Sequence, residues 1–304
     1  MEKPRFHRAY LHPRHWLTWS YLAIWWLISQ LPYPILRLLA KGLAPILLRA
    51  GRRRRQIAER NLERCFPHLN ATERQQLLKD NFFSTAMALF ETGMAWFWPQ
   101  WRLRRLFTIE GLEHLQRDDE QGTILLAMHF TTLDIGGAFV NMSTCINAMY
   151  RVHKNPVYDY VQRKGRERHS PETDVIPRDD VRGMVRALKQ GRAIWYAPDQ
   201  DYGRRHSVFA PFFGVEAATV TATATFARLG RARVVPFVQT RLPGNRGFHV
   251  TIYPPLENYP VGDEREDAAR INSVIEERVR EQPDQYMWVH RRFKTRPEGE
   301  ASVY

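Results

Sequence analysis

The sequence predicts an α/β fold with a mixed, mostly parallel central sheet flanked by helices, preceded by an N-terminal hydrophobic membrane-anchor helix. Three observations lead to this prediction. From about residue 106 onwards, short apolar segments alternate with amphipathic ones, as in layered α/β domains. No internal repeat or low-complexity linker interrupts that region. Residues 16–50 are instead apolar and rich in tryptophan, which sets them apart as a separate segment.

The individual elements follow from apolar spacing and from their boundary residues. The segment 179–189 is a clear amphipathic helix, because its apolar residues recur at i, i+3, i+4 and i+7. Thr72 and Gln75 have the spacing of a capping box that would begin a long helix. The expected strands are 107–115 with a turn, 123–128, 146–152, 192–198, 233–238 and 248–253, and the expected helices are 72–95, one beginning at Asp134, 155–168, 179–189, 219–229 and 267–281.

The N-terminal segment has the composition of a membrane anchor. Its first apolar run, 16–31, falls somewhat short of the ~20 apolar residues of a bilayer span. It therefore either spans with snorkelling ends or lies at the interface as an amphipathic helix. Four consecutive arginines at 52–55 would bind anionic head groups. A buried core helix is the competing interpretation, disfavoured by the many tryptophans. We expect a basic-flanked anchor over 1–55 and one main domain over 56–304.

The composition indicates an anionic partner. The chain of 304 residues has 45 Lys and Arg against 32 Asp and Glu, a formal charge of +13. Such a charge favours nucleic acid, acidic proteins, phosphorylated lipids or membrane surfaces. The nine tryptophans favour a membrane, because tryptophan prefers the boundary between an apolar phase and water. Two cysteines without a CxxC spacing fit a reducing compartment.

His129 and Asp134 are the candidate catalytic residues. The chain has four His-x4-acid pairs, whereas about one is expected by chance, so the spacing alone says little. Only His129 ends an apolar strand, with Asp134 five residues later at the start of an apolar helix. The other three pairs lie in polar segments: His68 with Glu73, His114 with Asp119, and His169 with Asp174.

A histidine and an acid are the two residue types that form a general base and the group that orients it. One ring nitrogen of a histidine can accept a proton while an acid holds the N–H of the other. A nucleophilic serine is missing, because Ser143 and Thr144 lie at the far end of the helix and no GxSxG is present. A hydroxyl activated by His129 would therefore belong to a substrate, and transfer would be direct. A structural, hydrogen-bonded histidine explains the position equally well.

Longer motifs resemble one family. The segment H-F-T-T-L-D resembles the H-x4-D/E signature of the glycerolipid and lipid A acyltransferase superfamily. Motifs along nearly the whole chain resemble bacterial late acyltransferases of lipid A biosynthesis, in the lauroyl/palmitoleoyl branch that acylates Kdo2-lipid IVA. Members of this branch often have Glu where this chain has Asp134. The motifs are LHPRHWLTW (11–19), QLPYP (30–34), RNLERCFP (60–67), ETGMAWFWP (91–99), YAPDQDYG (196–203) and QYMWVHRRFKTRPEG (285–299).

The resemblance implies an O-acyltransferase with a glycerolipid acyltransferase-like fold, with no cofactor, no metal and no covalent acyl-enzyme. His129 would take the proton from a hydroxyl of a hydroxyacyl chain on Kdo2-lipid IVA, and Asp134 would orient His129 and stabilise its charge. The freed oxygen would attack the thioester of an acyl-acyl carrier protein. The oxyanion donor stays open between backbone N–H groups near residues 129–132 and an arginine.

Five further residues are candidates for substrate binding: Arg151, Asn155, Arg166, Asp199 and Asp201. Arg151 and Arg166 would contact the oxyanion or acceptor phosphates, or else be solvated surface arginines. Asp199 and Asp201 follow the strand at 192–198 and would bind glucosamine hydroxyls or pair with the arginines at 204–205.

The implied partners match the charge of the chain. Acyl carrier protein is acidic, the acceptor carries phosphates and carboxylates, and the inner leaflet is anionic, so a basic enzyme would be steered to all three. The resemblance implies location at the bacterial inner membrane, with the catalytic domain over 56–304 facing the cytoplasm and no nucleic acid as partner.

Two alternatives remain at this point. The first is another membrane glycerolipid acyltransferase, of the lysophosphatidate type. The second is a non-enzymatic, membrane-tethered nucleic-acid-binding protein, which explains the charge but not the strand-end histidine.

Overall fold

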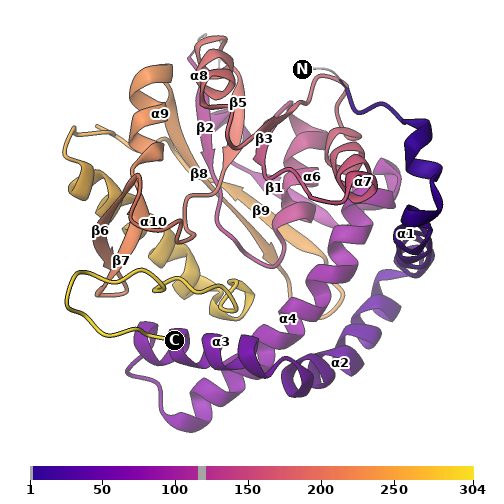
Figure 1. Ribbon diagram of the computed structural model, residues 1–304, viewed down its shortest axis with the longest axis horizontal. Helices are drawn as coiled ribbons and strands as arrows, with labels where there is room; N and C mark the ends of the chain where they lie inside the picture. Colours follow the sequence, from indigo (N-terminus) through magenta and orange to yellow (C-terminus); the bar gives the residue numbers. More distant parts are fainter. Residues whose placement is uncertain (1–2, 116–120) are drawn as a thin grey trace.

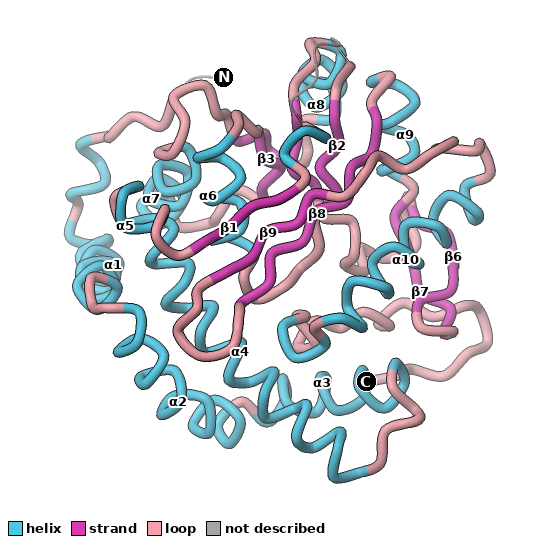
Figure 2. The backbone as a smooth tube through the Cα atoms, turned by 180° about the vertical axis from the view of Figure 1, so that it is seen from behind, coloured by secondary structure: helices cyan, strands magenta, loops and turns pink. Residues whose placement is uncertain are grey.

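The computed structural model describes residues 3–115 and 121–304 of the chain. A seven-stranded sheet with the order β1-β9-β8-β2-β5-β3-β4 forms the centre of this part (Figures 1 and 2). Neighbouring strands are parallel except for β8 and β9, which are antiparallel. Helices cover both faces, so the predicted α/β fold with a mixed, mostly parallel sheet is confirmed.

Six strands of this sheet overlap the expected ranges, and the short β4 was not expected. The strands are β1 (Phe107–Glu110), β2 (Thr123–Leu126), β3 (Asn147–Tyr150), β4 (Val175–Pro177), β5 (Ala193–Tyr196), β8 (Arg233–Arg241) and β9 (Phe248–Ile252). An antiparallel hairpin of β6 (Ser207–Phe212) and β7 (Val215–Val220) was also not expected. The β-branched Thr219 and Val220 end β7 rather than begin a helix.

The helices largely follow the expected ranges. They are α1 (Trp16–Ser29), α2 (Tyr33–Ala50), α3 (Arg52–Cys65), α4 (Ala71–Phe97), α5 (Gln100–Leu103), α6 (Leu133–Ser143), α7 (Pro156–Glu167), α8 (Val181–Lys189), α9 (Ala222–Gly230) and α10 (Glu264–Glu281). The capping box expected at Thr72 and Gln75 was wrong. Asn70 and Glu73 form the box instead, because the Asn70 side chain accepts from the Glu73 backbone N–H and the Glu73 carboxylate accepts from that of Asn70.

The core lies on both faces of the sheet, as the alternation of side chains in each strand requires. Leu125 and Trp195 belong to a cluster that also contains residues of α1, α2, α4 and α6. Ile124 and Ile194, one position earlier in the same strands, belong to the second cluster, with residues of α8, α9 and α10. Both faces are therefore buried, which explains the continuous apolar composition of β2.

The N-terminal segment is two helices packed on the main domain, and not a separate anchor helix. Leu22 and Trp25 of α1 and Leu36 of α2 are buried in the same core as the sheet, against α4. Trp25 is only 5% exposed. The expectation of one helix is corrected to two helices, separated near Pro32. Within 3–115 and 121–304 no helix is long and apolar enough to cross a membrane, and the interfacial alternative stays a prediction. The division into 1–55 and 56–304 stays a prediction.

The C-terminal segment 282–304 passes beside α3 and α4, below the sheet in Figure 1. Asn81 of α4 donates to the carbonyls of Asp284 (2.9 Å) and Tyr286. Asn61 of α3 donates to the carbonyl of Trp288 at 2.7 Å. These buried amides tie the segment to the helices at the edge where β2 ends, and this edge carries the candidate active site.

Candidate active site

His129 lies in the loop between β2 and α6 and is held by Asp199. The Nδ1 atom of His129 lies 2.5 Å from Asp199 Oδ1, and the backbone N–H of His129 donates to Asp199 Oδ2 at 2.8 Å. The Asp199 side chain is 1% exposed and the His129 side chain 18%. One carboxylate therefore fixes both the ring and the backbone of this histidine.

The register of two parallel strands brings these residues together. Leu126, the last residue of β2, is paired with Tyr196, the last residue of β5. His129 and Asp199 each follow their strand by three residues. Because the carboxyl ends of parallel strands meet at one edge of a sheet, the two side chains meet there.

Asp199 is ionised in this position. Burial raises the pKa of its carboxyl, but the His129 ring and the hydrogen bonds from His129 and Tyr286 outweigh burial and lower it from 3.8 to about 2. An ionised Asp199 accepts the Nδ1–H of the ring, which leaves the lone pair on Nε2. Within the described residues, Nε2 has no hydrogen-bond partner. The pair can therefore accept a proton from an incoming group at Nε2.

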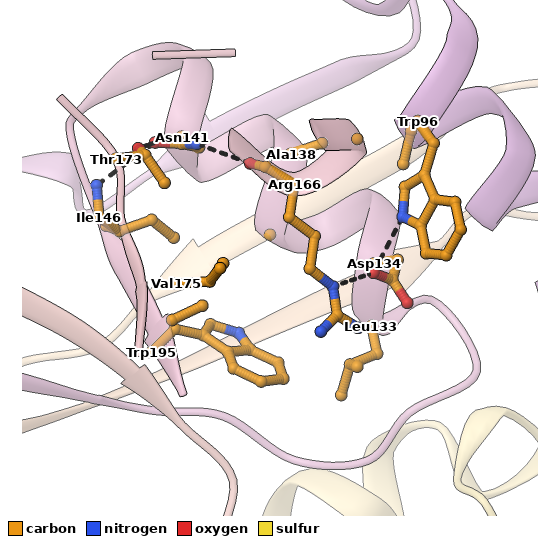
Figure 3. A pocket seen from close by; sticks show the side chains of 14 residues that line it. Trp96, Leu133, Asp134, Ala138, Asn141, Ile146, Arg166, Thr173, Val175 and Trp195 are labelled. Atoms are coloured by element: carbon orange, nitrogen blue, oxygen red, sulfur yellow. Dashed lines mark hydrogen bonds and ion pairs between the residues drawn. The ribbon is translucent and has the colours of Figure 1, made fainter. Parts of the chain in front are cut away.

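Asp134 has other partners, so the expectation that it holds the His129 ring needs correction. Asp134 Oδ1 accepts from Arg166 Nε of α7 at 2.8 Å and from Trp96 Nε1 of α4 at 3.3 Å. Asp134 is the second residue of α6, and its side chain is directed towards α4 and α7 (Figure 3). The contact with the ring of His129 is made by Asp199 instead.

The loop that carries His129 is fixed by the C-terminal segment. The backbone N–H of Met287 donates to the carbonyl of His129 at 2.9 Å, and that of Thr131 donates to the carbonyl of Gln285 at 2.7 Å. Tyr286, between these two, hydrogen-bonds Asp199 through its hydroxyl. The segment therefore positions both members of the pair.

A buried ion pair supports the same loop from the other side. Arg241, the last residue of β8, binds Glu91 of α4 in bidentate fashion, with Nε–Oε1 at 2.5 Å and Nη2–Oε2 at 2.7 Å. Nη2 also lies 3.3 Å from the Thr131 hydroxyl, and the Gln285 side chain binds the backbone of Arg241. Arg241 and Glu91 are 6% and 1% exposed. Removing one member would leave a buried, uncompensated charge.

The remaining candidate residues take different places. The Asp201 side chain is fully buried and accepts from the backbone N–H of Gly203 and from both the N–H and the hydroxyl of Thr295. It ties the 199–203 loop to the C-terminal segment, and Arg204 binds the Arg296 carbonyl instead of an aspartate.

Arg151 directly follows β3, and Asn155 is the N-cap residue of α7. The Asn155 side chain caps α7 through the backbone N–H groups of Val157 and Tyr158, and its amide donates to Thr18 of α1 at 2.8 Å. Arg151 is exposed. The structure thus brings Asp134 together with Arg166 and His129 with Asp199, while Asn155, Arg151 and Asp201 lie apart from both pairs.

A narrow slot begins at Asp134 and Arg166 and runs along α6 (Figure 3). The empty space within it and at its open mouth is about 490 Å³, of which about 40 Å³ is space that the centre of a water-sized molecule can occupy. Between its two polar ends, the residues that line the slot are small or apolar. They are Ala95, Trp96, Leu133, Gly137, Ala138, Ile146, Ala148, Gly165, Val175 and Trp195. Such a space accepts an apolar chain.

Several residues of the site were not recognised individually from the sequence. Glu91 and Trp96 lie in the motif at 91–99 and Tyr286 in the motif at 285–299, so membership of a long family motif was the available signal. Arg241 had no signal, because its burial depends on β8 lying beside β2.

Two of the other His-x4-acid pairs, His68 with Glu73 and His169 with Asp174, do not form comparable sites within the described residues. His68 is exposed, and Asp119 lies outside the described residues. His169 is 5% exposed and bonds to the Ala95 carbonyl.

Comparisons with known proteins identify the family of the chain. A sequence profile described as "Bacterial lipid A biosynthesis acyltransferase" matches residues 3–295. The lipid A biosynthesis palmitoleoyltransferase of Escherichia coli (strain K12) is 45% identical over 303 residues, 99% of this chain and 98% of that protein. The lipid A biosynthesis lauroyltransferase of the same strain is 45% identical over 304 residues, 99% of each chain.

Among solved structures, the 1-acyl-sn-glycerophosphate acyltransferase PlsC from Thermotoga maritima matches with a TM-score of 0.37 and 15% identity, covering 82% of this chain and 96% of that one. With a profile match and relatives that both extend over nearly its whole length, the chain is an acyltransferase that belongs to the bacterial lipid A biosynthesis acyltransferase family.

Proposed function

We propose that the enzyme transfers a fatty acyl chain from acyl-acyl carrier protein to a hydroxyl of a hydroxyacyl chain on Kdo2-lipid IVA. The single observation that carries the reaction is the His129–Asp199 pair, with Nε2 unbonded within the described residues at the carboxyl edge of the sheet. The acyl group and a lipid A-type acceptor follow the names of the relatives, which are a lauroyltransferase and a palmitoleoyltransferase of lipid A biosynthesis. Kdo2-lipid IVA and acyl carrier protein follow from the resemblance of the sequence motifs.

In the proposed first step, Nε2 of His129 takes the proton of the acceptor hydroxyl while its oxygen attacks the thioester carbonyl carbon. Asp199 stabilises the imidazolium that forms. The tetrahedral intermediate then collapses, the C–S bond breaks, and the leaving thiolate takes the proton from Nε2. No enzyme nucleophile is needed, and the Ser143 hydroxyl is bonded to the Phe139 carbonyl of its own helix.

Arg166 is our candidate for charge stabilisation. Its Nε is bonded to Asp134, and its side chain is 21% exposed at the mouth of the slot. The terminal guanidinium nitrogens can donate to a carbonyl oxygen that gains negative charge. In this proposal Asp134 acts as the anchor of Arg166, a role that differs from the one expected from the family signature.

We further propose that the enzyme acts at the cytoplasmic face of the bacterial inner membrane. The outer faces of α1 and α2 expose large apolar side chains, of which Leu17 is 83% and Leu38 68% exposed. Arginines 52–54 follow directly and are exposed. An apolar helix face next to basic residues binds the interface of an anionic leaflet. The apolar residues of this face are Trp16, Leu17, Tyr21, Ile24, Trp26, Leu27, Ile35, Leu38, Leu39 and Ile46.

The test is an acyl-transfer assay with the full chain in mixed micelles. Kdo2-lipid IVA and lysophosphatidate are offered as acceptors, and lauroyl- and palmitoleoyl-acyl carrier protein as donors. Mass spectrometry should show Kdo2-lipid IVA gaining one acyl mass, with lysophosphatidate unchanged. Acylation of lysophosphatidate alone would refute the proposed acceptor. Labelled acyl groups bound covalently to the protein in the absence of acceptor would refute direct transfer.

A further inference from the structure

The slot along α6 has a closed end made of hydrogen-bonded polar groups. The Asn141 amide oxygen accepts from the Thr173 hydroxyl at 2.5 Å and from the Ile146 backbone N–H at 3.4 Å. Its amide nitrogen donates to the Arg166 carbonyl at 3.3 Å. Figure 3 shows this cluster at the opposite end of the slot from Asp134, with Arg166 extending between the two ends. Every polar group of Asn141 is thus occupied.

The open end lies towards the catalytic edge. Asp134 is in the first turn of α6, which directly follows the loop that carries His129. From Asp134 to Asn141 the helix advances seven residues, or about 10 Å at 1.5 Å per residue. An extended hydrocarbon advances roughly 1.3 Å per carbon for bonds of about 1.5 Å. The distance from its mouth to its closed end therefore matches the length of roughly eight extended carbons.

The width of the slot depends on residues without large side chains. Gly137 lies in its wall, and a Cβ atom added there would meet no heavy atom within 4 Å. Gly165 faces it from α7, where a Cβ would approach the Trp96 ring to 2.5 Å. A side chain at 137 would consequently project into open space, whereas one at 165 would displace the wall.

We propose that the terminal methyl of the donor's acyl chain abuts the Asn141–Thr173 cluster, so that this cluster and the open face of Gly137 determine which chain length is transferred. The inference rests on the proposed acyl transfer and adds the residues that select its donor. Up to this chain length, each further methylene of the donor is buried and gains ~0.8 kcal/mol, which strengthens donor binding roughly fourfold. Beyond the limit, the next methylene must break the hydrogen bonds of Asn141 without replacing them. The length of the transferred acyl chain should therefore have a sharp upper limit.

Gly137→Leu tests the width. The leucine side chain would occupy the slot between its mouth and its closed end, so the preferred donor should become shorter. In a series from decanoyl- to palmitoyl-acyl carrier protein, relative kcat/KM for the longer donors should fall about 15-fold for every two methylenes excluded. Gly42→Leu is the matched control, because Gly42 also lies in a helix with no atom near its missing Cβ but far from the slot. It should leave the order of donors unchanged.

Thr173→Ala tests the closed end in the opposite direction. The substitution removes one hydroxyl and one methyl from the cluster while Asn141 keeps its bonds to Ile146 and Arg166. The preferred donor should become longer. An unchanged chain-length order in both variants, with transfer intact, would overturn the inference and leave the proposed function standing.

A photoreactive donor tests the slot without requiring turnover. Wild-type protein is illuminated with an acyl-acyl carrier protein whose chain ends in a diazirine, and the labelled peptides are identified by mass spectrometry. Labels within 141–148 and 173–175 are expected. Labels confined to other segments, such as α1 and α2, would overturn the inference even if no acyl transfer were detected. Absence of transfer with labels in the slot would instead refute the proposed reaction.

Discussion

Asp134 and Asp199 lie near the same edge of the sheet but belong to two different regions. Asp199 is 1% exposed and holds His129 through two hydrogen bonds. Asp134 is 14% exposed and holds Arg166 at the mouth of an apolar slot. Asp134 follows His129 by five residues, whereas Asp199 is 70 residues away. Nearness along the chain therefore did not decide which acid bonds to the histidine, and the register of two parallel strands did.

The two regions are suited to different tasks. The first combines a buried carboxylate whose pKa is lowered to about 2 with an unbonded imidazole nitrogen, which suits proton transfer. The second combines a guanidinium at a polar mouth with small and apolar walls, which suits binding and charge stabilisation. Substitutions in the two regions should therefore differ in their effects on kcat and on donor preference. Combining substitutions should show whether the two regions act independently.

The largest effect is expected for His129→Ala. Removing the base should lower kcat by at least about 10³-fold, near the upper part of the range for general-base catalysis. Circular dichroism should match wild type, while the unfolding midpoint should fall, because Asp199 stays buried and loses its bond to the ring. Near wild-type turnover in a correctly folded variant would refute the proton-transfer step.

Asp199→Asn should have a larger effect than Asp134→Asn. An amide at 199 can offer its N–H to Nδ1, which would favour the tautomer with the proton on Nε2 and remove the charge that stabilises the imidazolium. We expect a loss of about 10³-fold in kcat for Asp199→Asn, by the logic of an acid–histidine pair, and of about 10- to 100-fold for Asp134→Asn. Steady-state kinetics with one donor measures both.

The reverse order would show that Asp134 is the orienting acid in the reacting enzyme. Both variants replace oxygen by nitrogen at constant shape, so each serves as the structural control of the other. Equal unfolding midpoints would confirm that the comparison concerns catalysis.

Double-mutant cycles should separate the regions further. Asp134→Asn and Arg166→Met remove the two ends of one bonded pair, so their effects on kcat/KM should be far from additive, with a coupling of roughly 1–3 kcal/mol. Asp134→Asn and Asp199→Asn share no recorded bonded partner within the described residues, and their effects should add to within about 0.5 kcal/mol. Strong coupling of the two aspartates would mean that they act on one group.

Much of the fold could be predicted from local patterns. Apolar runs and helical spacing identified six of the seven strands of the central sheet and their flanking helices, because burial on both faces of a parallel sheet imposes those patterns. The β6–β7 hairpin was missed, since Thr219 and Val220 have no alternation that distinguishes a strand end from a helix start. The two N-terminal helices were taken for one anchor because their buried face, around Leu36, is as apolar as the exposed one.

The candidate site was predicted only in part. A strand end marked His129, and the motif at 196–203 marked Asp199, but nothing local places β5 next to β2. That adjacency is a property of the whole sheet, and it alone converts a residue assigned to substrate binding into the partner of the histidine. For the same reason the Arg241–Glu91 pair, which joins β8 to α4, had no counterpart in the sequence analysis.

A further effect concerns stability rather than turnover, through one buried histidine beside each region. His290 lies near Asp199 and accepts from the Asp201 backbone N–H, and His169 lies behind the slot at the end of α7. Burial is the main cause that lowers the pKa of each from 6.5 to about 4. The unfolded chain therefore binds more protons than the folded one between these pH values. Its free energy of unfolding should fall as the pH is lowered through that window, by roughly 3 kcal/mol per histidine, and the dependence due to them should flatten below pH 4.

Denaturant unfolding from pH 7 to 4 measures this dependence in wild type and in two single variants. His169→Gln and His290→Gln should each remove about half of the histidine contribution, because glutamine keeps a polar group but does not titrate. The control is His68→Gln, since His68 is exposed and should leave the slope unchanged. If only His290→Gln flattened the curve, His169 would be reached by water in the folded chain, and its burial beside the slot would be wrong. Equal effects from both variants would show that both histidines are buried and neutral in the folded chain, one beside each region.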